Sequence, residues 1–124
     1  MTYLGIDFGT KRIGLAKAEG EMRMAIPLRT IAHDEAVLDM LRSVVIDEKI
    51  DEIVLGIPVS FDGKEHEMAA AARAFGESLK EFGFPVHFQN EVLTSAQAGR
   101  EGGGDLDASS AALILQSFLD QKTA

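Results

Sequence analysis

The sequence contains no cysteine, which excludes a disulfide framework, a thiolate metal site and a cysteine nucleophile. It also lacks any apolar run close to the roughly 18 to 20 residues that a membrane-spanning helix requires. The first residues, Met1 to Leu4, show no basic region followed by an apolar core, so we expect no signal peptide. These absences predict a cytoplasmic protein with no membrane partner.

Basic residues are scarce. The chain has 12 Lys and Arg against 20 Asp and Glu, which gives a formal net charge of −8. Proteins that hold nucleic acid by electrostatics usually have a basic footprint, so this balance argues against tight nucleic-acid binding. It does not exclude a nuclease, because a carboxylate cluster that recruits metal ions needs only local positive charge.

The length of 124 residues fits a single domain, 1–124, which is long enough to bury a substantial core. A hydrophobic fraction of 46% and a charged fraction of 26% are those of an ordinary globular protein. There is no internal repeat and no stretch with the composition of a linker.

Hydrophobic periodicity changes along the chain. Leu4, Ile6 and Phe8 alternate with other residues, as in a strand, and glycine-led turns separate two further extended segments. Turns this short favour an antiparallel meander, and Pro27 favours an edge position for the third strand. The later segments alternate between helical stripes and short apolar runs that are typical of buried parallel strands. We expect strands at 3–8, 13–18, 22–30, 53–57 and 85–90, and helices at 34–48, 68–82, 94–100 and 107–121, with glycines 102–104 breaking the chain before the last helix.

This order, βββαβαβα with a small extra helix before the last, predicts an α/β fold. Right-handed crossovers would place the later strands parallel to the first. The expected architecture is a mixed five-stranded sheet with helices on both faces.

Asp7 is the most informative single residue. Aspartate is depleted inside strands, because its short charged side chain resists burial and competes for backbone hydrogen bonds. Asp7 is therefore either a solvent-facing residue on an open sheet face or a residue that binds a metal ion or a nucleophilic water.

A metal ion such as Mg²⁺ prefers several oxygen ligands, so other acids would have to converge on Asp7. If the fifth strand lies beside the first, Glu91 just past it reaches the same sheet end, and Asp107 at the start of the last helix could cover that end. Three carboxylates could then hold two divalent ions for in-line phosphodiester hydrolysis. Taken alone, Glu91 is typical of a surface residue and Asp107 of a helix N-cap. Glu101 or Asp105 could replace Glu91 in this set.

Several segments resemble the YqgF/RuvX family of Holliday-junction-resolvase-like nucleases, which has the ribonuclease-H-like fold. They lie in family order and span nearly the whole chain. The first is Gly-Ile-Asp-Phe-Gly-Thr-Lys-Arg-Ile-Gly at 5–14, and the second is Val-Leu-Gly-Ile-Pro at 54–58 with Asp-Gly at 62–63. The others are Glu-Val-Leu-Thr-Ser at 91–95 and the terminal helix segment at 107–117.

The resemblance implies an endonuclease that acts on structured nucleic acid, either precursors of 16S rRNA or branched DNA. It implies Mg²⁺ or Mn²⁺ as the cofactor, with Asp7, Glu91 and Asp107 as catalytic residues and metal ligands. The remaining motif positions would contact substrate: Thr10, Lys11, Arg12, Thr94 and Ser95. For Lys11 and Arg12, an ordinary solvated turn is an equally good interpretation.

Two departures from the family pattern concern substrate binding. The segment at 90–95 resembles the family's Asp-Glu-Arg-Leu-Thr-Ser signature, but here Asn90 stands in place of the aspartate. Val92 replaces the arginine, which removes a forked phosphate-binding donor. The segment 100–107 is also short and acidic. These changes predict reduced activity or an unusual substrate, with the three acids retained.

Two alternatives remain open from the sequence. Asp-Phe-Gly-Thr after a first strand also resembles the phosphate-binding opening of actin-like ATPases, although those folds use two domains. A non-catalytic ribonuclease-H-like module that binds nucleic acid or protein would account for the acidic charge. The three histidines are scattered and predict no zinc site, and the sequence leaves open a homodimer.

Overall fold

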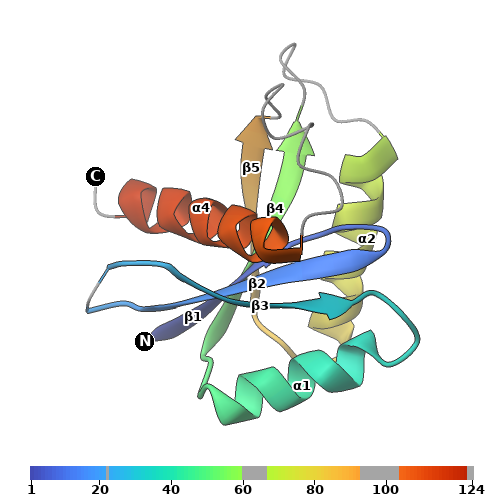
Figure 1. Cartoon of the computed structure of the whole chain (residues 1–124), viewed down its shortest axis with the longest axis horizontal. Helices are drawn as coiled ribbons and strands as arrows, with labels where there is room; N and C mark the ends of the chain where they lie inside the picture. Colours follow the sequence, from blue (N-terminus) through green and yellow to red (C-terminus); the bar gives the residue numbers. More distant parts are fainter. Residues whose placement is uncertain (22, 60–66, 93–103, 123–124) are drawn as a thin grey trace.

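The computed structural model describes residues 1–21, 23–59, 67–92 and 104–122, without the side chains of 92 and 104–107 (Figure 1). The elements follow the predicted order βββαβαβα. They are β1 (Thr2–Asp7), β2 (Arg12–Glu19), β3 (Ile26–Ala32), α1 (Val37–Asp47), β4 (Glu52–Val59), α2 (Glu67–Glu81), β5 (Val86–Val92) and α4 (Gly104–Lys122). The predicted helix at 94–100 lies outside the described residues.

The strands form one mixed sheet in the order β3-β2-β1-β4-β5. β2 pairs antiparallel with both β1 and β3, which confirms the predicted meander. β4 is parallel to β1 and to β5, as the crossover argument predicted. Pro27 lies on the edge strand β3, close to a register shift between Leu15 and Ala16 of β2, so its missing N–H interrupts no central ladder.

The assumption that the fifth strand lies beside the first is wrong. β4 separates β1 from β5, because the other edge of β1 is already occupied by β2. The crossover through α2 therefore adds β5 outside β4, and any site shared by Asp7 and Glu91 must span three strands.

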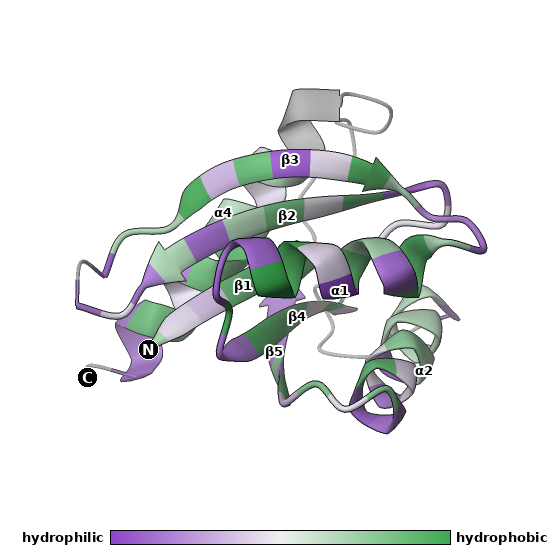
Figure 2. Cartoon of the chain, turned by 90° about the horizontal axis from the view of Figure 1, so that it is seen from below, coloured by the Kyte–Doolittle hydropathy of each residue, from purple (hydrophilic) through white to green (hydrophobic). Residues whose placement is uncertain are grey.

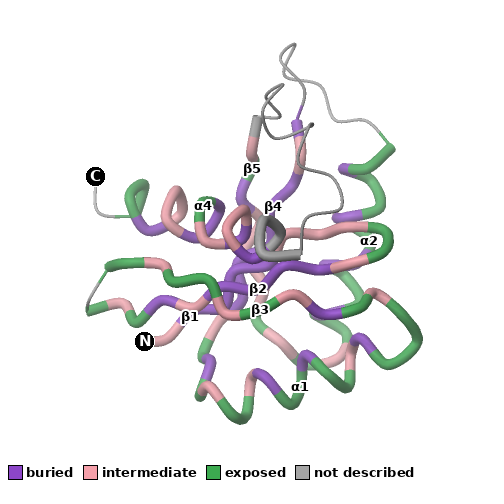
Figure 3. The backbone as a smooth tube through the Cα atoms, viewed as in Figure 1, coloured by how far each residue is buried: buried purple, intermediate pink, exposed green. Residues whose placement is uncertain are grey.

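Helices cover both faces of the sheet, as predicted. α1 and α2 share a core with Leu4, Ile6 and Leu55 on one face, whereas α4 packs on Tyr3 and Val54 on the other (Figures 1 and 2). The alternation of β1 thus sends even-numbered residues toward α1 and α2 and odd-numbered residues toward α4. Buried residues are concentrated in the central strands (Figure 3).

Several element boundaries differ from the sequence prediction. α1 begins at Val37, because the Asp34 carboxylate accepts the N–H of Ala36 at 2.9 Å and forms a turn ahead of the helix. β4 continues through Pro58 to Val59 as an edge segment, since β1 has already ended beside it. α4 begins at Gly104, so this glycine belongs to the helix that it was expected to precede.

None of the helices in the described ranges combines the length and apolar character needed to cross a membrane.

Two glycines allow α4 to lie very close to the sheet. A Cβ on Gly5 of β1 would lie 2.8 Å from the Cβ of Leu115 and 2.9 Å from the carbonyl oxygen of Ala111. A Cβ on Gly56 of β4 would overlap the side chain of Ile114. The absence of these two side chains sets the distance between α4 and the strands β1 and β4.

We expect Gly5→Ala to destabilise the protein by about 1 to 3 kcal/mol, because the backbone of Ala111 cannot move aside without shifting α4. Gly56→Ala should cost less, and its cost should fall further in an Ile114→Ala background, where the overlapping atoms are gone. Urea unfolding of the four variants measures both effects. Equal costs for Gly5→Ala and Gly56→Ala would contradict this account of the packing.

Candidate active site

Asp7 is the last residue of β1 and is half-buried. It follows Tyr3 and Gly5 on the face that α4 covers, where the Tyr3 ring packs edge-on against Phe118 with ring centroids 5.6 Å apart. The aspartate that was anomalous for a strand interior thus occupies the carboxyl end of the strand, at the rim of the α4 interface.

Glu91 lies inside β5 rather than just past it, paired with Pro58 of β4. It shares a strand face with His87, whose ring centroid lies 5.3 Å from that of Phe118 on α4. Burial raises the pKa of Glu91 above its usual value, and a hydrogen bond with the Ser117 side chain on α4 opposes part of this rise. Burial therefore disfavours the ionised form of Glu91 by more than the hydrogen bond with Ser117 favours it.

The register relates the two acids to each other. Ile6 pairs with Leu55, so Asp7 lies level with Gly56, which pairs with Gln89. Glu91 is two residues further along β5 and two strand spacings from β1, which is about 10 Å across the sheet. The structure therefore brings Asp7 and Glu91 to the same face and the same edge, at the carboxyl ends of parallel strands.

Asp107 lies on the first turns of α4, and the structure describes its backbone but not its side chain. Ala111 packs on Gly5 and Phe118 on Tyr3, so α4 runs antiparallel to β1. The turn that carries Asp107 precedes Ala111 and lies toward the end of β1 that carries Asp7. Within the side chains that the structure describes, no three acidic or histidine groups are clustered closely enough to hold a metal ion.

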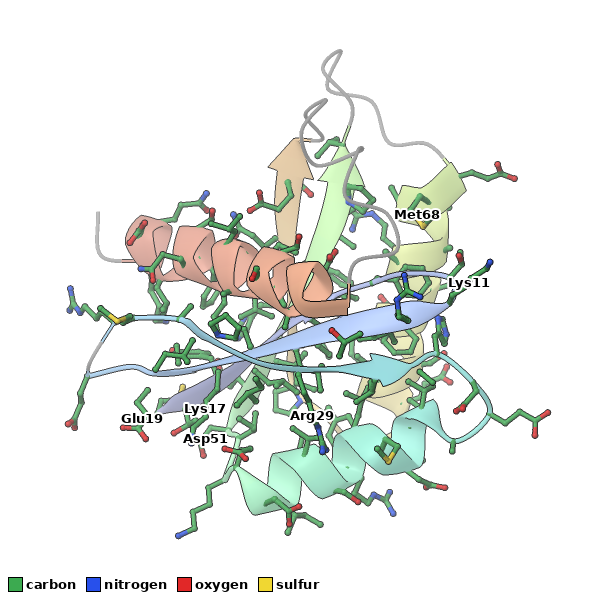
Figure 4. All side chains as sticks on the ribbon, viewed as in Figure 1. Lys11, Lys17, Glu19, Arg29, Asp51 and Met68 are labelled. Carbon is green, nitrogen blue, oxygen red and sulfur yellow. The ribbon has the colours of Figure 1, made fainter. Side chains whose placement is uncertain are left out.

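The predicted phosphate-contacting residues occupy the β1–β2 turn, residues 8–11, and the start of β2. Thr10 and Lys11 are exposed, and Figure 4 shows Lys11 pointing away from the sheet at the end of the hairpin. Arg12 is half-buried at the first position of β2, paired with Ala32. Thr94 and Ser95, together with the alternative acid Glu101, lie outside the described residues.

Asn90 is exposed and, by strand alternation, lies on the opposite face of β5 from Glu91. The side chain at this position therefore does not contribute to the carboxylate face. Sequence reasoning missed Ser117, since a serine within an amphipathic helix is indistinguishable from an ordinary interface residue.

A mixed sheet with an acidic residue at the end of its first strand and a covering C-terminal helix defines a class of proteins, the ribonuclease-H-like fold. RuvC from T. thermophilus, solved in complex with a Holliday junction substrate, shares this fold at a TM-score of 0.56 and 14% identity, over 99% of this chain and 96% of that one. Fowlpox virus resolvase matches at a TM-score of 0.59 and 9% identity over the whole of both chains. These likenesses confirm the predicted fold.

The family model described as RuvX, Holliday junction resolvase, matches residues 1–121, and the chain belongs to this family. It is 38% identical to a protein of Anaeromyxobacter sp. (strain Fw109-5) over the full length of both. It is 40% identical to one of Dechloromonas aromatica (strain RCB), over 96% of this chain and 90% of the relative. Both relatives carry the name "Putative pre-16S rRNA nuclease". The predicted enzyme class, a nuclease that hydrolyses phosphodiester bonds, is thereby confirmed.

Glu91 leads to a prediction about pH. Because burial raises its pKa in the folded state, its contribution to stability is present below the ordinary value of 4.5 and is lost as pH rises through the folded-state pKa. With divalent ions chelated, Glu91→Gln should therefore be more stable than the wild type at pH 7, and the difference should disappear below pH 4.5.

Urea unfolding at both pH values measures this difference. Glu81→Gln, which removes an exposed acid at the end of α2, is the control and should change little. A destabilised Glu91→Gln variant at pH 7 would show that the carboxylate is already compensated in the metal-free protein.

Proposed function

We propose that this chain is a metal-dependent endonuclease that cuts structured nucleic acid, with precursors of 16S rRNA as its substrate and branched DNA as the alternative. One observation carries the proposal. Asp7 and Glu91 share the α4-covered face at the carboxyl ends of parallel strands, in a chain that belongs to the RuvX family. The names of the relatives support the choice of RNA.

The donor set fits a hard divalent cation. Carboxylate oxygens are the preferred protein ligands of Mg²⁺ and suit Mn²⁺ equally. The chain has no cysteine, so methionine is its one source of sulfur ligands. The raised pKa of Glu91 marks a carboxylate whose ionised form a cation would stabilise. Asp7, Glu91 and Asp107 are the residues that would hold such ions.

Two bound divalent ions would supply an activated water and neutralise charge on the leaving oxygen. The residues of the chain have separate tasks around that chemistry. Asp7 on β1 and Glu91 on β5 face the substrate from two strands, and the first turns of α4 add Asp107 from above. Since the three acids come from separate rigid elements, their spacing is set by the packing of α4 on the sheet.

Substrate binding is assigned to the predicted motif positions near this edge. Lys11 and Arg12 provide positive charge for phosphates, and Thr10, Thr94 and Ser95 provide hydroxyl donors. With a net charge of −8, the protein as a whole repels nucleic acid, so these local contacts must hold the strand at the carboxylate face.

The first test is cleavage of labelled 16S rRNA precursor, a four-way DNA junction and an unstructured RNA with Mg²⁺ or Mn²⁺. We expect cutting of the precursor, with Asp7→Asn and Glu91→Gln each reducing the rate by more than about 100-fold, because they remove metal ligands. Glu81→Gln, an exposed acid on α2, is the matched control and should cut normally.

Cutting of the junction alone would move the assignment to branched DNA. Binding without cutting under either metal would instead favour the non-catalytic module. Cleavage that survives Asp7→Asn would exclude the proposed site.

Salt dependence tests the assigned phosphate contacts. Removing one contact should lower the slope of log affinity against log salt concentration by about 0.7 to 1, whatever the sequence of the nucleic acid. We expect this change for Lys11→Ala, measured by fluorescence anisotropy with Ca²⁺ in place of Mg²⁺. Lys49→Ala, which removes an exposed cation just after α1, is the control and should leave the slope unchanged.

A further inference from the structure

His33 is hydrogen-bonded to two residues of the β1–β2 turn. Its ring Nδ1 lies 2.6 Å from the carbonyl oxygen of Gly9, and its backbone N–H donates to the carbonyl of Lys11 at 3.0 Å. A carbonyl can only accept, so Nδ1 carries the hydrogen and donates to Gly9. One residue from the connection between β3 and α1 therefore restrains the turn that carries Thr10 and Lys11.

Aromatic packing fixes the His33 ring. The ring meets Phe8 of the turn at a centroid distance of 5.2 Å and Phe75 of α2 at 5.4 Å, both edge-on. Phe8 and Phe75 also contact each other, with centroids 5.3 Å apart. The three rings connect the turn to α2 and keep the imidazole aimed at the Gly9 carbonyl.

The turn itself is tightly folded. A Cβ on Gly9 would overlap the carbonyl oxygen of Arg12, so only glycine fits this position. Lys11 is nevertheless exposed at the tip of the hairpin and points away from the sheet (Figure 4). The flexible Lys11 side chain thus projects from a turn whose backbone is restrained by hydrogen bonds at Gly9 and Lys11.

We propose that His33 is a positioning residue that preorganises the β1–β2 turn for contact with a phosphate of the nucleic-acid strand. The inference rests on the proposed function. A restrained turn loses less conformational freedom when Lys11 binds a phosphate, which strengthens binding without any contact between His33 and the substrate. The chemical step at Asp7 and Glu91 does not depend on this contact.

Two substitutions separate hydrogen bonding from packing. His33→Asn keeps an N–H donor close to the position of Nδ1 but removes the ring, whereas His33→Phe keeps the ring and removes the donor. We expect His33→Phe to raise KM and the Kd for labelled RNA about three- to tenfold, with kcat within about twofold of wild type, as the loss of one hydrogen bond predicts. His33→Asn should recover most of the affinity. The opposite order would show that His33 acts through packing and would overturn the proposal.

A double-mutant cycle shows whether His33 acts through the turn. In a Lys11→Ala background, His33→Phe should weaken RNA binding by less than about twofold, because the cation that it positions is already absent. Fully additive effects would overturn the proposal, as would an unchanged affinity in Lys11→Ala alone.

Amide hydrogen exchange at residues 10–12 separates failure of this inference from failure of the proposed function. His33→Phe should speed exchange there at least about tenfold and leave the protection of β4 intact. If wild type neither binds nor cuts nucleic acid, the proposed function fails, and exchange alone decides whether His33 holds the turn. Unchanged exchange in His33→Phe would overturn the positioning role.

Discussion

The close approach of α4 to β1 and β4 is the constraint on which the rest of this structure depends. It requires that Gly5 and Gly56 have no side chains, since Leu115, Ala111 and Ile114 occupy the space that a Cβ would take. The same contact buries one face of the sheet and brings the N-terminal turns of α4 toward the end of β1. Core packing on this face and the position of the N-terminal turns of α4 are therefore set by the same contact.

This arrangement has an electrostatic cost. The side of the sheet that α4 covers includes Glu91, whose pKa is raised because burial penalises its charge more than the Ser117 hydrogen bond compensates. A structure selected only for stability would replace such a carboxylate with an apolar or neutral residue. A carboxylate with a raised pKa on the same sheet face as Asp7 is consistent with the proposed metal site, where a cation would offset the charge.

The acidic balance of the chain and the position of its cations fit together. A net charge of −8 gives little long-range attraction for nucleic acid, so affinity must come from a few well-placed local contacts. The phosphate contact proposed for the β1–β2 turn would meet this requirement, because His33 and the rings of Phe8 and Phe75 restrain the turn while Lys11 stays exposed. Asn90 lies on the opposite face of β5 from Glu91 and does not contribute to the carboxylate face.

The sequence by itself determined the order of the described elements, the meander and the edge position of Pro27, because periodicity and residue preference are local properties. Only the tertiary structure decided that β4 separates β1 from β5, that Glu91 lies within its strand beside α4, and that Ser117 and His33 act on distant segments. Strand order follows from which sheet edge is free, and contacts such as that of His33 with Gly9 join residues 24 positions apart. No local pattern in the chain encodes such pairings.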